Sequence, residues 1–257
     1  MAEAAVETRV NVWCLPLIRQ LEGGRAGKPA VGAPDDAALA RMAALLSPEE
    51  RAIAAAFDSP DRRRSYIAAH ALLRSILGRM IGVAPNELVF RYGHRGKPEL
   101  AGPAPHNVQF NMSHSRDVVL VAVAHGRRVG VDIEHIDEPG DVRRIAARFL
   151  SPRDRDAIEQ LPLERQREGF LRCWTRKEAY MKARGDGISR PLDDFDVALS
   201  AESARATPRL SNVVGDPSEA DRWELADVSA PRGFMAAIAV EGHGFEVVQH
   251  VDWTADD

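Results

Sequence analysis

The chain has 257 residues, of which 45% are hydrophobic and 28% are charged, and its formal net charge is −4. This length allows one large domain or two of roughly 100 to 150 residues, with enough apolar content for a packed core. The acidic balance argues against nucleic acid as a partner, although a local basic cluster could still bind phosphates.

Cysteine usage and the N-terminus indicate a cytoplasmic protein. Cys14 and Cys173 are too few for a disulfide framework or a cysteine-based zinc site, so a reducing compartment is the simpler interpretation. Glu3, Glu7 and Arg9 interrupt the apolar stretch that a signal peptide needs, and no run approaches the roughly 18 apolar residues of a membrane span. We therefore expect no membrane partner.

The chain is predicted to begin with a strand and continue into helices. Residues Thr8 to Leu17 alternate apolar and other side chains, as a half-buried strand does. A Gly/Pro/Ala-rich connection follows to about Pro34. The tetrapeptide Ser47-Pro48-Glu49-Glu50 forms a capping box, which predicts a short helix to about Phe57.

A long helix should follow the second start signal, Ser59-Pro60. Apolar residues from Tyr66 to Ile81 recur with helical periodicity. Its first turn carries Arg62, Arg63 and Arg64, where the helix dipole disfavours positive charge. A bound phosphate or plain solvation would each explain these arginines.

From Glu87 the pattern changes to short strands separated by Gly, Pro and Asn. A loop from Gly93 to Pro105 contains the tripeptide Gly96-Lys97-Pro98. The predicted strands are Leu88 to Tyr92, Val108 to Met112, Val118 to Ala124, and Gly130 to His135.

The second half repeats these types of element. Ser151-Pro152 starts a helical region, and a helix from about Leu163 should end at Gly185. Segments 118–126 and 234–242 occupy equivalent positions, which suggests a duplicated α+β unit with halves 1–128 and 129–257. The remaining predicted strands are Phe195 to Leu199, Trp223 to Asp227, Phe234 to Val240, and Val247 to Trp253.

Two acidic residues share one face of the predicted strand at 130–135. Asp132 and Glu134 are two residues apart, so their Cα atoms should lie roughly 7 Å apart on the same side. Their carboxylates could converge on one cation, and oxygen ligands suit Mg²⁺ or Mn²⁺. The alternative is a polar strand face in water.

The helix that ends at Gly185 carries charge on a face that is normally apolar. Trp174, Lys177, Glu178 and Lys182 fall at positions that recur along one side of a helix. The alternative is a solvated face on which Glu178 and Lys182 form an ion pair.

The stretch Asn111 to Ser115 combines two hydroxyls with an imidazole. A serine hydrolase is disfavoured, because the adjacent Ser113 and His114 point apart in an extended chain and no G-x-S-x-G elbow exists. We expect a loop that donates hydrogen bonds to an anion. Together with the acids and lysines, it describes phosphoryl-type transfer on a nucleotide-like substrate.

The motifs, in order, resemble those of the 4′-phosphopantetheinyl transferases of the surfactin-synthetase-activating type. They are Gly96-Lys97-Pro98, Phe110-Asn111-Met112-Ser113-His114-Ser115, Gly130-Val131-Asp132-Ile133-Glu134, and Trp174-x-x-Lys177-Glu178-Ala179-x-x-Lys182-x-x-Gly185-x-Gly187. The resemblance runs from about Ser47 to Val240.

This resemblance implies an α+β fold that is a pseudo-dimer of two similar halves, each a helix packed on a small antiparallel sheet. Coenzyme A would bind between the halves of a monomer. The implied reaction transfers the 4′-phosphopantetheine arm of coenzyme A to a serine of an acyl or peptidyl carrier protein. Such carriers serve fatty-acid, polyketide or nonribosomal-peptide synthesis.

The resemblance also implies residue roles. Asp132, Glu134 and Glu178 would hold Mg²⁺, or Mn²⁺, and Glu178 would be the base for the incoming serine. Lys177 and Lys182 would contact phosphates, with Lys182 stabilising the departing bisphosphate.

The remaining roles concern coenzyme A itself. Gly96, Lys97 and Pro98 would lie along the adenine, and Ser113 and His114 would line the site, with His114 at the 3′-phosphate. Residues Glu49 to Ala56 supply a single cation, Arg51, where related enzymes have several. Arg64 and Arg74 are therefore expected to bind the 3′-phosphate instead.

Two other functions fit the same residues. A metal-dependent phosphodiesterase would cleave coenzyme A with water and without a carrier. A non-catalytic carrier-binding module would bind carriers irrespective of metal.

Overall fold

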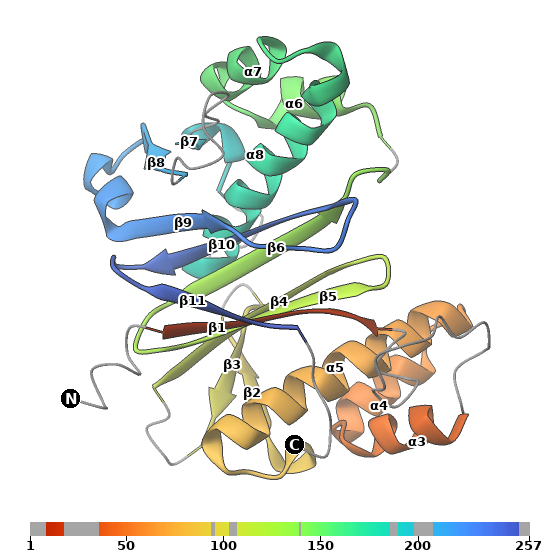
Figure 1. Ribbon diagram of the computed structural model, residues 1–257. Coiled ribbons are helices and arrows are strands. Elements are labelled where there is room, and N and C mark those ends of the chain that lie inside the picture. The colour runs from red at the N-terminus through yellow and green to blue at the C-terminus, as the bar shows by residue number, and fades with distance from the viewer. Residues whose placement is uncertain are drawn as a thin grey trace.

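The structure is a computed structural model that describes residues 9–17, 36–93, 96–102, 107–138, 140–185, 190–197 and 208–251. Two units lie one above the other in Figure 1, each with a long helix on the outer face of a small sheet. The inner faces of the two sheets pack on each other through a buried aliphatic layer that includes Val12, Leu120, Val131 and Ile238. The α+β fold class is confirmed.

The first unit is built on a four-stranded sheet in the order β11-β1-β5-β4. Its long helix α5, Pro60–Ile81, packs on the outer face of this sheet. The other elements of this region are β1 Arg9–Pro16, α3 Asp36–Ala44, α4 Pro48–Ala55, the 3-10 helix η1 Pro85–Glu87, β2 Val89–Tyr92, β3 Pro98–Ala101, β4 Val108–Ser115 and β5 Val118–His125.

The second unit is built on a three-stranded sheet in the order β6-β10-β9. Its long helix α8, Leu163–Arg184, ends at Gly185, whose φ of 77° is left-handed, as the sequence predicts. The other elements are β6 Val129–His135, α6 Val142–Phe149, α7 Pro152–Glu159, the 3-10 helices η3 Leu192–Asp194 and η4 Pro217–Arg222, β7 Asp196–Val197, β8 Leu210–Ser211, β9 Trp223–Asp227 and β10 Phe234–Glu241. The final strand, β11 Glu246–His250, belongs to the sheet of the first unit.

The helix starts read from the sequence are confirmed. Ser47 Oγ accepts a hydrogen bond from Glu50 N at 3.2 Å, and Glu50 Oε2 accepts one from Ser47 N at 3.0 Å. Ser59 and Ser151 cap α5 and α7 in the same position before a proline. Each hydroxyl satisfies a main-chain N–H that a helix start leaves without a partner.

Several elements differ from the sequence-based expectation. The loop expected from Gly93 to Pro105 contains β3, which pairs antiparallel with β2. Residues 113–115, expected in a loop, are the end of β4 and pair with β5. Helices α3 and α6 and the short strand β8 were not predicted. The connection expected from Leu17 to Pro34 lies almost wholly outside the described residues.

The last strand crosses between the two parts of the chain. β11 pairs in parallel with β1, so a segment of the predicted second half completes the sheet of the first. The rings of Trp13 and His250 stack across this pairing, with centroids 4.5 Å apart. The predicted division at residue 128 falls in the turn between β5 and β6.

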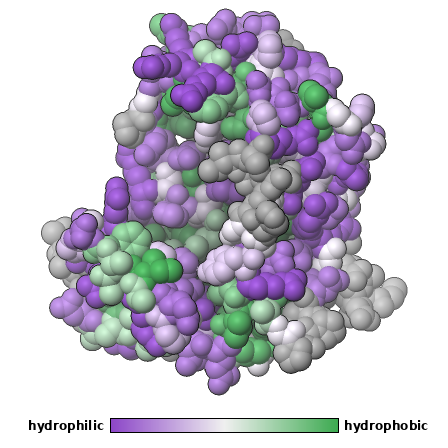
Figure 2. Space-filling model, turned by 180° about the vertical axis from the view of Figure 1, so that it is seen from behind, coloured by the Kyte–Doolittle hydropathy of each residue, from purple (hydrophilic) through white to green (hydrophobic). Residues whose placement is uncertain are grey.

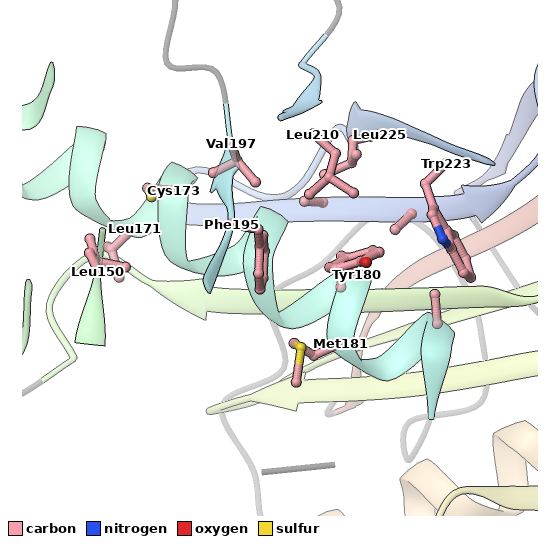
Figure 3. Close-up of a cluster of buried hydrophobic side chains, with 14 of the residues drawn as sticks. Leu150, Leu171, Cys173, Tyr180, Met181, Phe195, Val197, Leu210, Trp223 and Leu225 are labelled. Atoms are coloured by element: carbon pink, nitrogen blue, oxygen red, sulfur yellow. The ribbon is translucent and has the colours of Figure 1, made fainter. Parts of the chain in front are cut away.

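Helix α8 lies unusually close to β6. A Cβ atom built on Gly130 would be 2.2 Å from the main-chain atoms Ala179 O and Ala183 N. On the opposite side of α8, Tyr180 lies between Phe195 and Trp223, with edge-on ring centroids 4.9 and 5.5 Å away (Figure 3). The helix is therefore held between the sheet and an aromatic cluster.

Candidate functional site

The site begins with two strands that belong to different sheets but lie side by side. Ser113 Oγ on β4 donates a hydrogen bond to Asp132 Oδ1 on β6 at 3.0 Å. Two residues further along both strands, Ser115 Oγ donates to Glu134 Oε2 at 3.3 Å. The offset between partners is 19 residues in both pairs, so the strands run in the same direction and their polar faces meet.

Helix α8 adds a lysine and a third carboxylate to this polar face. Lys182 Nζ lies 2.6 Å from Asp132 Oδ1 and donates to Ser113 Oγ at 2.9 Å. The ion pair considered between Glu178 and Lys182 does not form, because Lys182 binds Asp132 instead. Glu178 is half-buried and forms no hydrogen bond or ion pair with another described residue.

Burial raises the proton affinity of all three acidic side chains, and the Asp132 charge adds to this effect on the other two. Burial raises the pKa of Asp132, against the effect of Lys182, and Asp132 is only 3% exposed. Burial and the Asp132 charge raise the pKa of Glu134 to about 7. The same two causes raise the pKa of Glu178. Negative charge is therefore concentrated beyond what Lys182 compensates.

Asp132 has one carboxylate oxygen without a partner. Its Oδ1 accepts from Ser113 and Lys182, whereas Oδ2 is buried and accepts no hydrogen bond. Such an atom in a buried carboxylate is unfavourable unless a ligand satisfies it. Within the described ranges, however, no three His, Cys, Asp or Glu side chains converge closely enough to form a ready-made metal site.

The predicted phosphate contact of Lys177 is wrong. Its side chain is 0% exposed, with Nζ 2.6 Å from Asp154 Oδ2, and it donates to the main-chain oxygens of Leu192 and Phe195. Lys182 follows Lys177 by five positions, which places their side chains about 140° apart around the helix axis. Lys177 therefore points into the core of the second unit, while Lys182 points to β6.

The predicted phosphate contact of Arg74 is also wrong. Arg74 is 2% exposed, and its Nε lies 2.5 Å from Glu50 Oε2. One terminal nitrogen donates to the main-chain oxygens of Pro85 and Leu88, at 2.7 and 3.0 Å. Arg74 thus ties α4 and η1 to α5. Arg64, by contrast, is partly exposed near the start of α5, where it pairs with Asp61 at 2.5 Å.

The tripeptide Gly96-Lys97-Pro98 leads into β3 and contacts the second unit. Gly96 has a φ of 82°, a left-handed conformation that suits glycine. Lys97 Nζ donates to Val129 O and Ala183 O, both at 3.0 Å. It therefore joins the hairpin of β2 and β3 to β6 and to the end of α8. Burial and the Arg128 charge lower the Lys97 pKa to about 8. A cavity of about 210 Å³ adjoins this lysine.

Ser113 and His114 face different surroundings, as expected for neighbours in a strand. The Ser113 hydroxyl contacts Asp132 and Lys182, so it serves the carboxylate directly. His114 is exposed, and desolvation together with the nearby Lys182 and His70 lowers its pKa. In the view from behind, the surface is hollowed between the two units (Figure 2).

The contacts that two further β4 residues make with β6 were not predicted from the sequence. Ser115 contacts Glu134, and Asn111 Oδ1 accepts from Val131 N at 2.9 Å. The signal was present in the alternation of polar residues at 111, 113 and 115. That alternation is typical of a strand whose polar face is turned to polar partners.

Comparisons with known proteins show the family of this chain. A family model described as "4'-phosphopantetheinyl transferase superfamily" matches residues 128–238, and one described as "4'-phosphopantetheinyl transferase, N-terminal" matches residues 32–126. The chain is 38% identical over 207 residues to the 4'-phosphopantetheinyl transferase HetI of Nostoc sp. (strain PCC 7120), covering 80% of this chain and 82% of the relative.

Two further similarities were found. The 4'-phosphopantetheinyl transferase Sfp of Bacillus subtilis (strain 168) is 30% identical over 159 residues, which are 62% of this chain and 69% of the relative. The solved holo-(acyl-carrier-protein) synthase from Bacillus anthracis, in complex with CoA (3',5'-ADP), has a TM-score of 0.32 and 18% identity. That likeness covers 45% of this chain and 93% of the solved one.

Proposed function

The chain belongs to the 4′-phosphopantetheinyl transferase superfamily, and we propose that it transfers the 4′-phosphopantetheine arm of coenzyme A to a serine of an acyl or peptidyl carrier protein. This reaction converts an apo carrier to its holo form and releases adenosine 3′,5′-bisphosphate. The observation that carries the proposal is the buried contact of Asp132 with Lys182, flanked by Glu134 and Glu178.

We also propose the finer identity of the enzyme. The order and spacing of its four motifs, together with the similarity to Sfp, support the surfactin-synthetase-activating type. Its two cysteines are both free, which fits a reducing cytoplasm. Among the described residues, no helix is both long enough and apolar enough to span a membrane. The protein would act as a monomer whose two units share one site.

A divalent cation, Mg²⁺ or Mn²⁺, fits the chemistry of this site. Oxygen donors suit both ions, Asp132 Oδ2 is buried without a hydrogen-bond partner, and the crowded carboxylates need positive charge. Asp132, Glu134 and Glu178 would hold the cation beside the pyrophosphate of coenzyme A. When bound, the cation would withdraw negative charge from the phosphate oxygens.

Two side chains of α8, Glu178 and Lys182, would have separate roles in the transfer step. The Oγ of the carrier serine attacks the phosphorus that bears pantetheine, and the bond from this phosphorus to the bridging oxygen breaks. Its electron pair leaves with adenosine bisphosphate. Glu178 takes the serine proton, a role that needs a carboxylate within hydrogen-bond reach of the serine. Lys182 stabilises the charge of the leaving group.

Coenzyme A would lie along the surface where the two units meet. We propose that Gly96, Lys97 and Pro98 line the adenine and that His114 meets the 3′-phosphate. Of the two arginines expected at the 3′-phosphate, only Arg64 remains a candidate, because Arg74 is buried and paired with Glu50. Ser113 would act in the site through Asp132 and Lys182.

A carrier-modification assay tests this function. The enzyme, coenzyme A and Mg²⁺ are incubated with apo carriers from fatty-acid, polyketide and nonribosomal-peptide synthesis, and mass spectrometry detects the phosphopantetheine adduct. Glu178→Gln should abolish transfer at an unchanged melting temperature, because Glu178 has no described hydrogen-bond or ion-pair partner to lose. Glu164→Gln, at an exposed position of the same helix, should remain active.

The same assay separates the competing functions. Absence of the adduct on every carrier would contradict the transferase. Release of free phosphopantetheine without a carrier would indicate the phosphodiesterase. Carrier binding that persists in EDTA without modification would indicate a binding module.

A further inference from the structure

Ser113 on β4 and Lys182 on α8 both bind the same oxygen of the Asp132 carboxylate. One oxygen of this carboxylate, Oδ1, accepts from Ser113 Oγ at 3.0 Å and from Lys182 Nζ at 2.6 Å. The other oxygen, Oδ2, has no hydrogen-bond partner although it is buried. The carboxyl group is therefore fixed through one oxygen, and the second is left for a ligand.

Ser115 holds one oxygen of the Glu134 carboxylate. Its Oγ donates to Glu134 Oε2 at 3.3 Å and accepts from His135 N at 3.1 Å. Because the hydroxyl accepts from the main chain, its proton is directed at the carboxylate. Ser115 is buried, so water does not compete freely for this bond.

The geometry of the two strands makes these contacts a pair. Side chains alternate along a strand, so positions two apart share a face. Ser113 and Ser115 therefore meet Asp132 and Glu134 in register, on the face of β6 that also carries Gly130 under α8. Both hydroxyls approach from β4.

We propose that Ser115 is a positioning residue for Glu134, as Ser113 is for Asp132, and that these hydroxyls select which oxygen of each carboxylate faces a divalent cation. This inference rests on the metal site proposed above. A carboxylate held at one oxygen has already lost rotational freedom before the cation binds, so cation binding costs less conformational entropy.

A purely structural role for the serines would be to join the two sheets, and Asn111 provides the comparison. Its Oδ1 accepts from Val131 N at 2.9 Å, so it joins β4 to β6 without contacting a carboxylate. Like Ser115 it is buried. Asn111→Ala therefore removes a hydrogen bond between the same strands and serves as the matched control for Ser115→Ala.

The test measures Mn²⁺ binding by electron paramagnetic resonance, with coenzyme A present and no carrier, so that no turnover occurs. Ser115→Ala should weaken Mn²⁺ binding by about tenfold or more, the usual effect of losing a group that orients a metal ligand. Asn111→Ala should lower the melting temperature and leave Mn²⁺ affinity unchanged. Ser115→Thr, which keeps the hydroxyl, should recover most of the affinity.

Each other outcome decides against the inference. Equal Mn²⁺ affinity in Ser115→Ala and the native protein would overturn the positioning role while leaving the metal site intact. Equal losses in Ser115→Ala and Asn111→Ala would assign both residues to joining the sheets. Absence of Mn²⁺ binding by the native protein would refute the metal site and the inference together. If Ser115→Ala does not fold, Ser115→Cys replaces it, because a thiol fills the same space but donates weakly.

Discussion

Replacing Gly130 by alanine should move α8 away from β6 and slow the transfer reaction. The added Cβ would lie 2.2 Å from Ala179 O and Ala183 N, and both are main-chain atoms that no side-chain rotation can move. To increase these two distances to about 3.2 Å, α8 has to shift by about 1 Å relative to β6. The displaced turn carries Glu178 and Lys182, and Lys182 Nζ lies only 2.6 Å from Asp132.

The expected size of the effect follows from that shift. Overpacking a buried contact costs roughly 1 to 3 kcal/mol of stability. A displacement of about 1 Å in a catalytic group can lower the rate by a factor of about 100. We therefore expect Gly130→Ala to remain folded, with a lower melting temperature and a strongly reduced kcat for carrier modification.

The assay combines thermal unfolding with initial rates of holo-carrier formation by mass spectrometry. Gly169→Ala is the matched control, because it lies in the same helix but meets only the Leu161 side chain, which can move. It should keep full activity. A Gly130→Ala enzyme with native kcat would refute the claim that close packing of α8 on β6 sets the catalytic geometry.

Three further predictions concern the buried charges and the contact between the units. Lys177→Met should destabilise the fold by roughly 3 to 5 kcal/mol in chemical denaturation, because it leaves Asp154 buried without its cation, and activity should fall only as folded protein is lost. Burial acts to raise the pKa of Glu50, but the hydrogen bonds of this carboxylate lower the pKa to about 2. The stability that Glu50 contributes above pH 4.5 should therefore be lost as the pH falls toward 2. Glu50→Gln should reduce this acid dependence of the melting temperature. Lys97→Met should raise the KM for coenzyme A, since it removes the hydrogen bonds to Val129 O and Ala183 O, whereas Lys97→Arg, if it restores them, should recover the native KM.

Local sequence signals predicted the parts of the fold that local forces determine. The capping box at Ser47 and the Ser-Pro pair at residue 59 locate helix starts, because a hydroxyl must satisfy nearby main-chain N–H groups. The left-handed Gly185 ends α8 for an equally local reason. The carboxylates of β6 were also found, because a two-residue period fixes which side chains share a face.

Features determined by distant partners could not be found in this way. The end of β4 looked like a loop because Ser113 and Ser115 are polar, and only their contacts with β6 explain polar residues in a buried strand. The pairing of β11 with β1 joins residues at opposite ends of the sequence. Lys177 and Lys182 belong to one charged segment, and only the surroundings of α8 distinguish them.

Burial alone does not distinguish Arg74 and Lys177 from Asp132, but the hydrogen bonds of these three side chains do. Arg74 and Lys177 are fully buried, yet each is surrounded by acceptors and an opposite charge. Asp132 is equally buried, but one oxygen has no hydrogen-bond partner, and its charge raises the pKa of Glu134 and Glu178. A buried carboxylate oxygen without a hydrogen-bond partner is an unfavourable arrangement, and it is expected where a ligand completes it.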